Sequence, residues 1–205
     1  MRTLHLHPLA SYCQKALIAL YERAVPFEPR VVDLGAAADR EALTRLWPLT
    51  RFPVLEEDGR VVAESSIIVE HLCPELIPAE RDAALECRFL DRVFDLYVND
   101  PVGVVVRDVL RPEGSRDPLG VQRARDTLRT AYGLLEARLQ GRTWAAGDAF
   151  TLADCAAAPA LFYAARVEAF HQPRLGAYFE RLLARPSVAR VVEEARPFMH
   201  MFPIR

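Results

Sequence analysis

The spacing of apolar residues changes character near residue 73, and this change limits the fold more than any other feature. Before it, short alternating runs typical of strands are interleaved with runs at helical spacing. After the segment 74–78, which begins and ends with proline, strand patterns stop and the apolar residues follow a helical repeat. We therefore predict a small α+β domain over residues 1–76 and an all-helical domain over residues 83–205.

The first domain is predicted to have the element order β-α-β-α-β-β-α. The pair Asp58-Gly59, flanked by apolar runs, is a strong signal for a tight hairpin turn. Asp39 and Ser65 are expected to be the N-cap residues of the second and third helices, because their side chains accept hydrogen bonds from free helical amides. The predicted strands are 4–6, 27–32, 54–56 and 61–63, and the predicted helices begin near residue 16 and cover 39–46 and 65–72.

The second domain is predicted to consist of five amphipathic helices. In the first of them one face carries Leu85, Phe89, Val93, Leu96 and Tyr97. The predicted helices are 80–99, 119–139, 152–166, 174–184 and 187–195, and the apolar tail 198–205 is expected to dock on them.

Composition excludes several classes of function. The 205 residues include 26 Lys plus Arg against 28 Asp plus Glu, and a net charge of -2 provides no basic field for nucleic acid. Four cysteines lie far apart in the sequence, which predicts neither a zinc site nor a disulfide framework but reduced and mostly buried thiols. No apolar run approaches the ~18 residues of a membrane span, and we expect a cytoplasmic protein without a metal.

A proline motif points to a family. Arg51-Phe52-Pro53-Val54-Leu55 places a proline at the entrance to a strand that an Asp-Gly hairpin follows. With the predicted element order, this stretch resembles the soluble glutathione transferases, whose turn before a cis-proline often reads Asn-Pro-x-Gly-Lys-Val-Pro; Trp47 and Thr50 depart from that pattern. A cis peptide would turn the amide and carbonyl of Phe52 outward, where an extended tripeptide could pair with them. A trans proline that opens an edge strand is the alternative.

Two further motifs agree with this resemblance. Glu64-Ser65 begins a helix, where free amides suit a small carboxylate. The resemblance implies that Ser65 binds the γ-glutamyl carboxylate of glutathione and that Glu64 binds its ammonium. The alternative is that Ser65 is an ordinary helix cap with no role in ligand binding. A capping box from Thr151 to Asp154, preceded by Gly147, resembles the family's Gly-x-x-x-Thr-x-Ala-Asp signature and indicates a structural role in starting a buried helix.

The chemistry is expected at the start of the first helix. Glutathione must ionise near neutral pH, although a free thiol has a pKa of ~8.5, so a donor to the sulfur is needed. Ser11 is our candidate and Tyr12 the reserve, and backbone amides alone are a third possibility because Ala10 occupies the position of the serine in many relatives. Cys13 is expected to be a packed thiol rather than a nucleophile.

The resemblance covers the whole chain and implies a cytosolic, bacterial-type glutathione transferase with a serine-like active site. Such an enzyme adds the thiolate of its co-substrate glutathione to a small hydrophobic electrophile, acts in detoxification and forms a homodimer. Arg51, Phe52, Pro53, Glu64 and Ser65 would bind glutathione. The alternatives are a glutathione-dependent isomerase of the maleylacetoacetate type, and a binding or assembly protein that kept the fold without catalysis.

Overall fold

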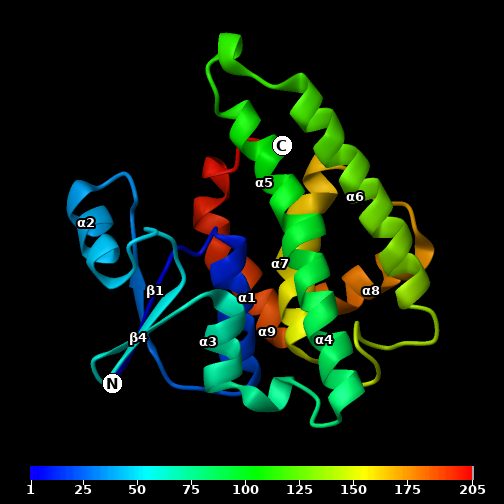
Figure 1. Ribbon diagram of the computed structural model, residues 1–205, viewed down its shortest axis with the longest axis horizontal. Coiled ribbons are helices and arrows are strands. Elements are labelled where there is room, and N and C mark those ends of the chain that lie inside the picture. Colours follow the sequence, from blue (N-terminus) through cyan, green and yellow to red (C-terminus); the bar gives the residue numbers. More distant parts are fainter. Residues whose placement is uncertain (205) are drawn as a thin grey trace.

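The computed structural model describes residues 1–204 and places a mixed four-stranded sheet beside a bundle of helices (Figure 1). The strand order is β2-β1-β3-β4, in which β1 pairs in parallel with β2 and antiparallel with β3. The predicted order of elements is confirmed for this half of the chain. Its strands and helices are β1 (Arg2–Leu6), α1 (Ser11–Glu22), β2 (Glu28–Val31), α2 (Ala37–Leu46), β3 (Val54–Glu57), β4 (Arg60–Ala63), α3 (Ser65–Leu72) and the 3-10 turn η1 (Pro74–Leu76).

The local sequence correctly predicts the hairpin between β3 and β4 but not the residue that caps α2. Asp58 and Gly59 have φ of 49° and 82°, the left-handed pair that the tight turn requires, so the predicted hairpin is confirmed. The prediction that Asp39 caps α2 is wrong, because Ala36 holds the N-cap position. The Asp39 carboxylate instead accepts a hydrogen bond from the backbone amide of Asp33 at 3.0 Å, which fastens the loop before the helix.

The rest of the described chain is helical, as predicted. The first long helix does not stop at residue 99 but passes through a π-helical segment and continues to Val109. Among residues 1–204, no helix is both long and apolar enough to cross a membrane. The elements are α4 (Arg81–Val93), the π-helical η2 (Phe94–Asn99), α5 (Asp100–Val109), η3 (Glu113–Ser115), α6 (Pro118–Arg138), α7 (Leu152–Val167), α8 (Pro173–Leu183), α9 (Pro186–Ala195) and η4 (Arg196–Met201).

Helix α7 is the centre of the core. It is buried along most of its length and packs against α1, α4, α5 and α8, so it connects the sheet side of the molecule with the bundle (Figure 1). All four cysteines are buried, as predicted, and none is paired with another. The tail docks as expected as far as Ile204: the Phe202 ring lies 5.1 Å from that of Tyr163. Arg205 lies outside the described residues.

The capping box at the start of α7 is confirmed and is completely buried. The Asp154 carboxylate accepts hydrogen bonds from the Thr151 amide at 2.8 Å and the Thr151 hydroxyl at 3.0 Å. It also accepts from the Ala145 amide at 2.8 Å and the Tyr178 hydroxyl at 2.7 Å, so four donors from three segments meet on one side chain. The box therefore fixes the loop before α7 and the helix α8 as well as α7 itself.

The apolar face predicted on residues 80–99 forms, but most of it faces outward. Leu85, Phe89 and Tyr97 are 54%, 41% and 53% exposed, and only Val93 of the predicted set is buried. The core is filled from the opposite side of the helix, which carries Cys87, Leu90, Phe94 and Val98. The helix is therefore apolar on two sides, and its spacing alone did not show which of them meets the core.

Candidate active site

A cavity of about 210 Å³ lies between the loops of the sheet and the long helix α4 to α5. All five residues predicted from the sequence to bind glutathione line this cavity, whereas Ser11 does not. Side chains from the helical half of the chain close its other side. The lining residues are Tyr12, Trp47, Arg51, Phe52, Pro53, Glu64, Ser65, Arg92, Asp95, Leu96 and Asp100.

The loop before β3 presents backbone groups and one cation to this cavity. The Phe52-Pro53 peptide is cis, and neither the amide nor the carbonyl of Phe52 has a hydrogen-bond partner within residues 1–204. The Phe52 ring stacks toward the His7 imidazole with centroids 6.2 Å apart. Arg51 is exposed, and no carboxylate of the described chain lies within ion-pair distance of its guanidinium. An extended ligand could therefore pair with the Phe52 backbone and place an anionic end at Arg51.

The start of α3 differs from the prediction in one respect. Ser65 is not the N-cap but the first helical residue, since the Glu64 carbonyl already accepts the first helical bond, from Ile68 at 2.9 Å. Glu64 has φ of 73°, a conformation that costs a non-glycine residue of order 1–3 kcal/mol and is concentrated at functional sites. Ser65 is buried at the cavity wall, where its hydroxyl and the free amides of the first turn of α3 could donate hydrogen bonds to a small anion.

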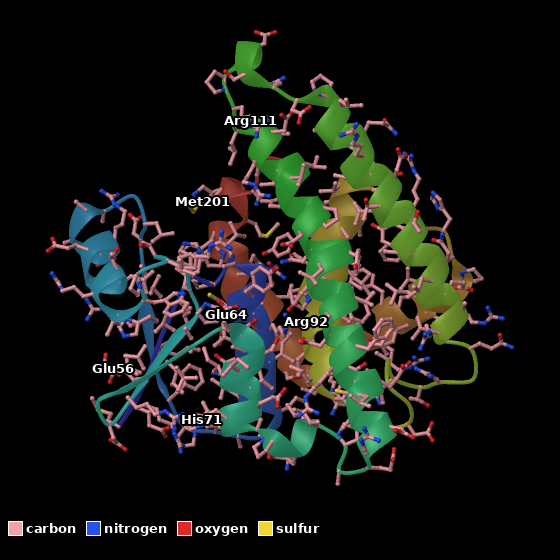
Figure 2. All side chains as sticks on the ribbon, viewed as in Figure 1. Glu56, Glu64, His71, Arg92, Arg111 and Met201 are labelled. Atoms are coloured by element: carbon pink, nitrogen blue, oxygen red, sulfur yellow. The ribbon has the colours of Figure 1, made fainter. Side chains whose placement is uncertain are left out.

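Below this helix start lies a buried ionic network that sequence reasoning missed. Lys15, the only lysine in the chain, is 1% exposed and its ammonium donates to Ser66 Oγ and Asp95 Oδ2, both at 2.8 Å. It also contacts Asp91 Oδ1. Arg92 pairs with the carboxylates of Asp91 and Asp95 at 2.7 Å each and reaches the cavity. Figure 2 shows Arg92 on α4 across from Glu64 at the start of α3.

The charges of this buried network balance one another. Burial raises the pKa of Asp95, although the attraction of Lys15 opposes that shift. Two cations and two carboxylates balance, so the cluster as a whole is neutral and can remain beneath the cavity. The signal that could have indicated it is the i, i+4 spacing of Asp91 and Asp95 on a predicted helix, but only the tertiary structure brings Lys15 of α1 to them.

A second cavity of about 300 Å³ opens beside the first, and Ser11 lies in it. Tyr12 and Asp100 line both cavities, so the two meet at the N-terminus of α1. The Ser11 hydroxyl has no hydrogen-bond partner within the described part of the chain, whereas the Tyr12 hydroxyl donates to Asp100 Oδ1 at 3.1 Å. Burial raises the pKa of Tyr12, so this hydroxyl stays protonated and its one proton is already engaged. The Ser11 hydroxyl is therefore free to donate a hydrogen bond beside the junction.

Cys13, one turn into α1, is a packed thiol, as predicted. It is fully buried, and its sulfur accepts a weak hydrogen bond from the His7 amide at 3.4 Å. Burial raises the pKa of Cys13, which keeps the thiol protonated at neutral pH. A nucleophilic cysteine at this position is therefore disfavoured by the structure as well as by the sequence.

Comparisons with known proteins identify the family. The family described as glutathione S-transferase, N-terminal domain, matches residues 4–75, and glutathione S-transferase, C-terminal domain, matches residues 91–186. FtsZ-localized protein A of Caulobacter vibrioides is 33% identical over 174 residues, which are 77% of this chain and 74% of that protein. The chain belongs to the glutathione transferase family. The glutathione S-transferase GstB of Escherichia coli is 26% identical over 193 residues, 87% of this chain and 91% of that one.

A solved structure agrees in both fold and sequence. The glutathione S-transferase of Methylobacterium radiotolerans, determined in complex with glutathione sulfonate, superimposes with a TM-score of 0.83 at 30% identity. The match covers 93% of this chain and 94% of that one. The thioredoxin-like first half and the helical second half of this glutathione transferase family member are thus those of its relatives.

Proposed function

We propose that this family member is an active glutathione transferase, which uses glutathione as co-substrate and transfers it to a small hydrophobic electrophile. The observation that carries the proposal is the meeting of two cavities at one helix N-terminus, where Ser11 has an unengaged hydroxyl. The polar cavity would hold the tripeptide, mainly through residues 1–76, and the apolar one the electrophile, mainly through residues 83–205. Conjugation of this kind would serve detoxification, and the four unpaired cysteines fit the reducing cytoplasm.

Each part of glutathione has a complementary group in the first cavity. The γ-glutamyl carboxylate would accept from the Ser65 hydroxyl and the free amides of α3, and its ammonium would lie by Glu64 and Asp95. The cysteinyl backbone would pair with the amide and carbonyl of Phe52. The glycine carboxylate would meet the unpaired guanidinium of Arg51. This arrangement would direct the cysteinyl sulfur toward the junction with the second cavity.

The sulfur would then be activated by α1. Its free N-terminal amides and the helix dipole favour an anion, and the Ser11 hydroxyl would add a hydrogen bond to the thiolate. The thiolate attacks the electrophilic carbon, so a sulfur–carbon bond forms while a leaving group departs with its bonding electrons. Isomerisation would use the same thiolate for reversible addition, but the Trp that follows Ser-Ser-Cys in the maleylacetoacetate-type isomerases is absent after Cys13.

Calorimetric titration with glutathione tests the proposed site. We expect wild type to bind, and Ser65→Ala and Arg51→Gln each to weaken binding by about tenfold or more, because each loses a charge-assisted hydrogen bond of ~1.5–3 kcal/mol. Arg60→Gln is the matched control, since Arg60 is an exposed arginine in the nearby hairpin outside the cavity. Absence of binding to the wild type would refute the proposal.

An assembly role is the second candidate. The 33% identity to FtsZ-localized protein A and the presence of Ala10 at the position of the family's usual serine favour it. Co-sedimentation of the purified chain with FtsZ polymers tests it directly. Co-sedimentation that Ser11→Ala leaves unchanged, together with no turnover of any electrophile, would establish assembly in place of catalysis.

We also propose that the chain forms a homodimer through the outward apolar face of α4, η2 and α6. A groove of about 580 Å³ lies there between Phe89, Tyr97 and Leu134, all of which are exposed, and such surfaces on soluble proteins mark interfaces. A second copy that buried this face would remove the apolar area from water.

Light scattering after size exclusion tests the dimer. Wild type is expected at twice the chain mass of 23.1 kDa, and Tyr97→Glu at the monomer mass, because a symmetric contact would bury two equal charges. Leu119→Glu is the control, since Leu119 is 60% exposed at the far end of α6. A wild-type monomer would contradict the proposal.

A further inference from the structure

The polar side chains of the second cavity lie mostly at its junction with the first, where Ser11, Asn99 and Asp100 line it. Beyond the junction it is bounded by apolar side chains, among them Leu9, Val102, Val106 and Phe202, and it carries one arginine, Arg107 of α5. A volume of about 300 Å³ is at the small end of the range for ligand pockets, so any occupant is small. A purely apolar electrophile could form no ion pair with a single guanidinium at the edge of an apolar pocket.

Arg107, Arg111 and Tyr97 all lie on or just after the long helix, and the structure separates their surroundings. Tyr97 lies in the groove toward α6, on the other side of the helix. Arg111, labelled beyond the end of α5 in Figure 2, pairs with Asp108 at 3.4 Å and is not part of the cavity wall. Arg107 lines the cavity, and none of the carboxylates described in residues 1–204 lies within ion-pair distance of it.

The carboxylates nearest in sequence are engaged elsewhere. Asp108 accepts a hydrogen bond from the Asp117 amide at 2.6 Å in addition to its contact with Arg111. Asp100, at the cavity junction, accepts from the Tyr12 hydroxyl. The guanidinium of Arg107 therefore keeps its charge and its donors available to a ligand.

A glycine sets the position of this guanidinium. Arg107 folds back one turn along α5 and lies over Gly103, where a Cβ would come within 2.8 Å of its Nη1 atom. Gly103 also lines the cavity. Long side chains on helices lean toward the N-terminus, and the missing Cβ lets Arg107 lie close to the helix surface in that direction. The charge is thus held toward the end of α5 where the two cavities meet.

We propose that Arg107 binds an anionic group of the second substrate, so that the preferred acceptor is a small apolar electrophile bearing a carboxylate. This inference rests on the proposed transferase function and specifies its substrate class. The guanidinium would hold the carboxylate through two parallel hydrogen bonds, while the apolar wall holds the body of the molecule with its reactive carbon toward Ser11.

A matched pair of probes isolates the charge. In 4-chloro-3,5-dinitrobenzoate and its neutral amide, 4-chloro-3,5-dinitrobenzamide, the thiolate sulfur attacks the carbon that bears chlorine. The carbon–sulfur bond forms, the carbon–chlorine bond breaks, and chloride leaves with the bonding electrons. The two glutathione conjugates formed in this way can also be made chemically, and their binding can be measured by calorimetry whether or not the protein catalyses the reaction.

We expect wild type to bind the acid conjugate about tenfold more tightly than the amide conjugate. Arg107→Gln should abolish that preference and leave the affinity for the amide conjugate unchanged. Arg111→Gln should change neither the preference nor the affinity for the amide conjugate. Gly103→Ala should also reduce the preference, because the methyl group displaces the guanidinium, while alanine in place of glycine favours the helix and keeps the protein folded. Equal affinities for the two conjugates, or an acid preference that survives Arg107→Gln, would overturn the inference.

Turnover separates this inference from the function on which it rests. Conjugation of both chlorinated probes at equal rates by wild type, with equal conjugate affinities, would preserve the transferase and refute the role of Arg107. An acid preference in binding that depends on Arg107, without turnover of either probe, would support the anion site and refute the catalytic proposal.

Discussion

Replacing Asp154 with alanine is expected to lower the free energy of unfolding by more than ~4 kcal/mol. The carboxylate is fully buried and accepts from four donors, on Ala145, Thr151 and Tyr178. Each buried donor left without an acceptor costs about 1–3 kcal/mol, and a cavity adds to the loss. The same change also releases the loop before α7 and the contact with α8, so we expect little soluble protein at growth temperature.

Chemical denaturation measures this effect. Asp148→Ala is the matched control, because Asp148 is exposed in the same loop and its loss should change stability by less than ~0.5 kcal/mol. If Asp154→Ala does not fold, Asp154→Asn provides the comparison, since the amide keeps one acceptor oxygen and should be destabilised less. Glutathione affinity of the folded fraction should equal that of wild type. A midpoint unchanged from the control would refute the structural role of the box.

Replacing Lys15 with methionine is expected to cost about 3–5 kcal/mol, because it leaves two buried carboxylates with a half-exposed arginine as their remaining cation. The loss should depend on pH. Burial already raises the pKa of Asp95, and removal of the opposing ammonium raises it further. An acid whose pKa is higher in the folded than in the unfolded state gains a proton on folding, so stability falls as pH rises. The variant should therefore lose more stability at pH 8 than at pH 5.

The controls distinguish charge from packing. Arg45→Met removes a cation from an exposed i, i+4 pair with Glu41 and should cost less than ~0.5 kcal/mol. Lys15→Met combined with Asp95→Asn should recover part of the loss, since one uncompensated charge is removed with its partner. A loss that is independent of pH and is not reduced by the second substitution would show that Lys15 stabilises the fold by packing alone.

The fold could be predicted from sequence where local chemistry determines it. The Asp58-Gly59 turn and the Thr151 to Asp154 box each depend on residues close together in the chain, and both were correctly predicted. The cap of α2 and the cap of α3 were misassigned. Asp39 and Ser65 are residue types that favour caps, but in the structure they lie inside the first turn, and the extended or left-handed residue before each helix occupies the cap position.

The candidate site was predictable only in its continuous parts. Motifs of neighbouring residues, at 51–53 and 64–65, come together in one cavity. Arg92, Asp95 and Asp100 reach that cavity from a helix about thirty residues after the second motif. No local sequence pattern predicts where α4 and α5 pack. Arg107 could not be singled out from the sequence, because its lack of an ion-pair partner within residues 1–204 is a property of the tertiary structure.

The most direct test of the central claim is the pKa of glutathione bound to the protein, followed by the ultraviolet absorbance of its thiolate. We predict a pKa at least one unit below the free value of ~8.5 in wild type, corresponding to ~1.4 kcal/mol in favour of the thiolate. In Ser11→Ala we predict a rise toward the free value, and in Ser115→Ala, an exposed serine of η3, no change. Glutathione that binds to wild type with the pKa of the free thiol would contradict the account.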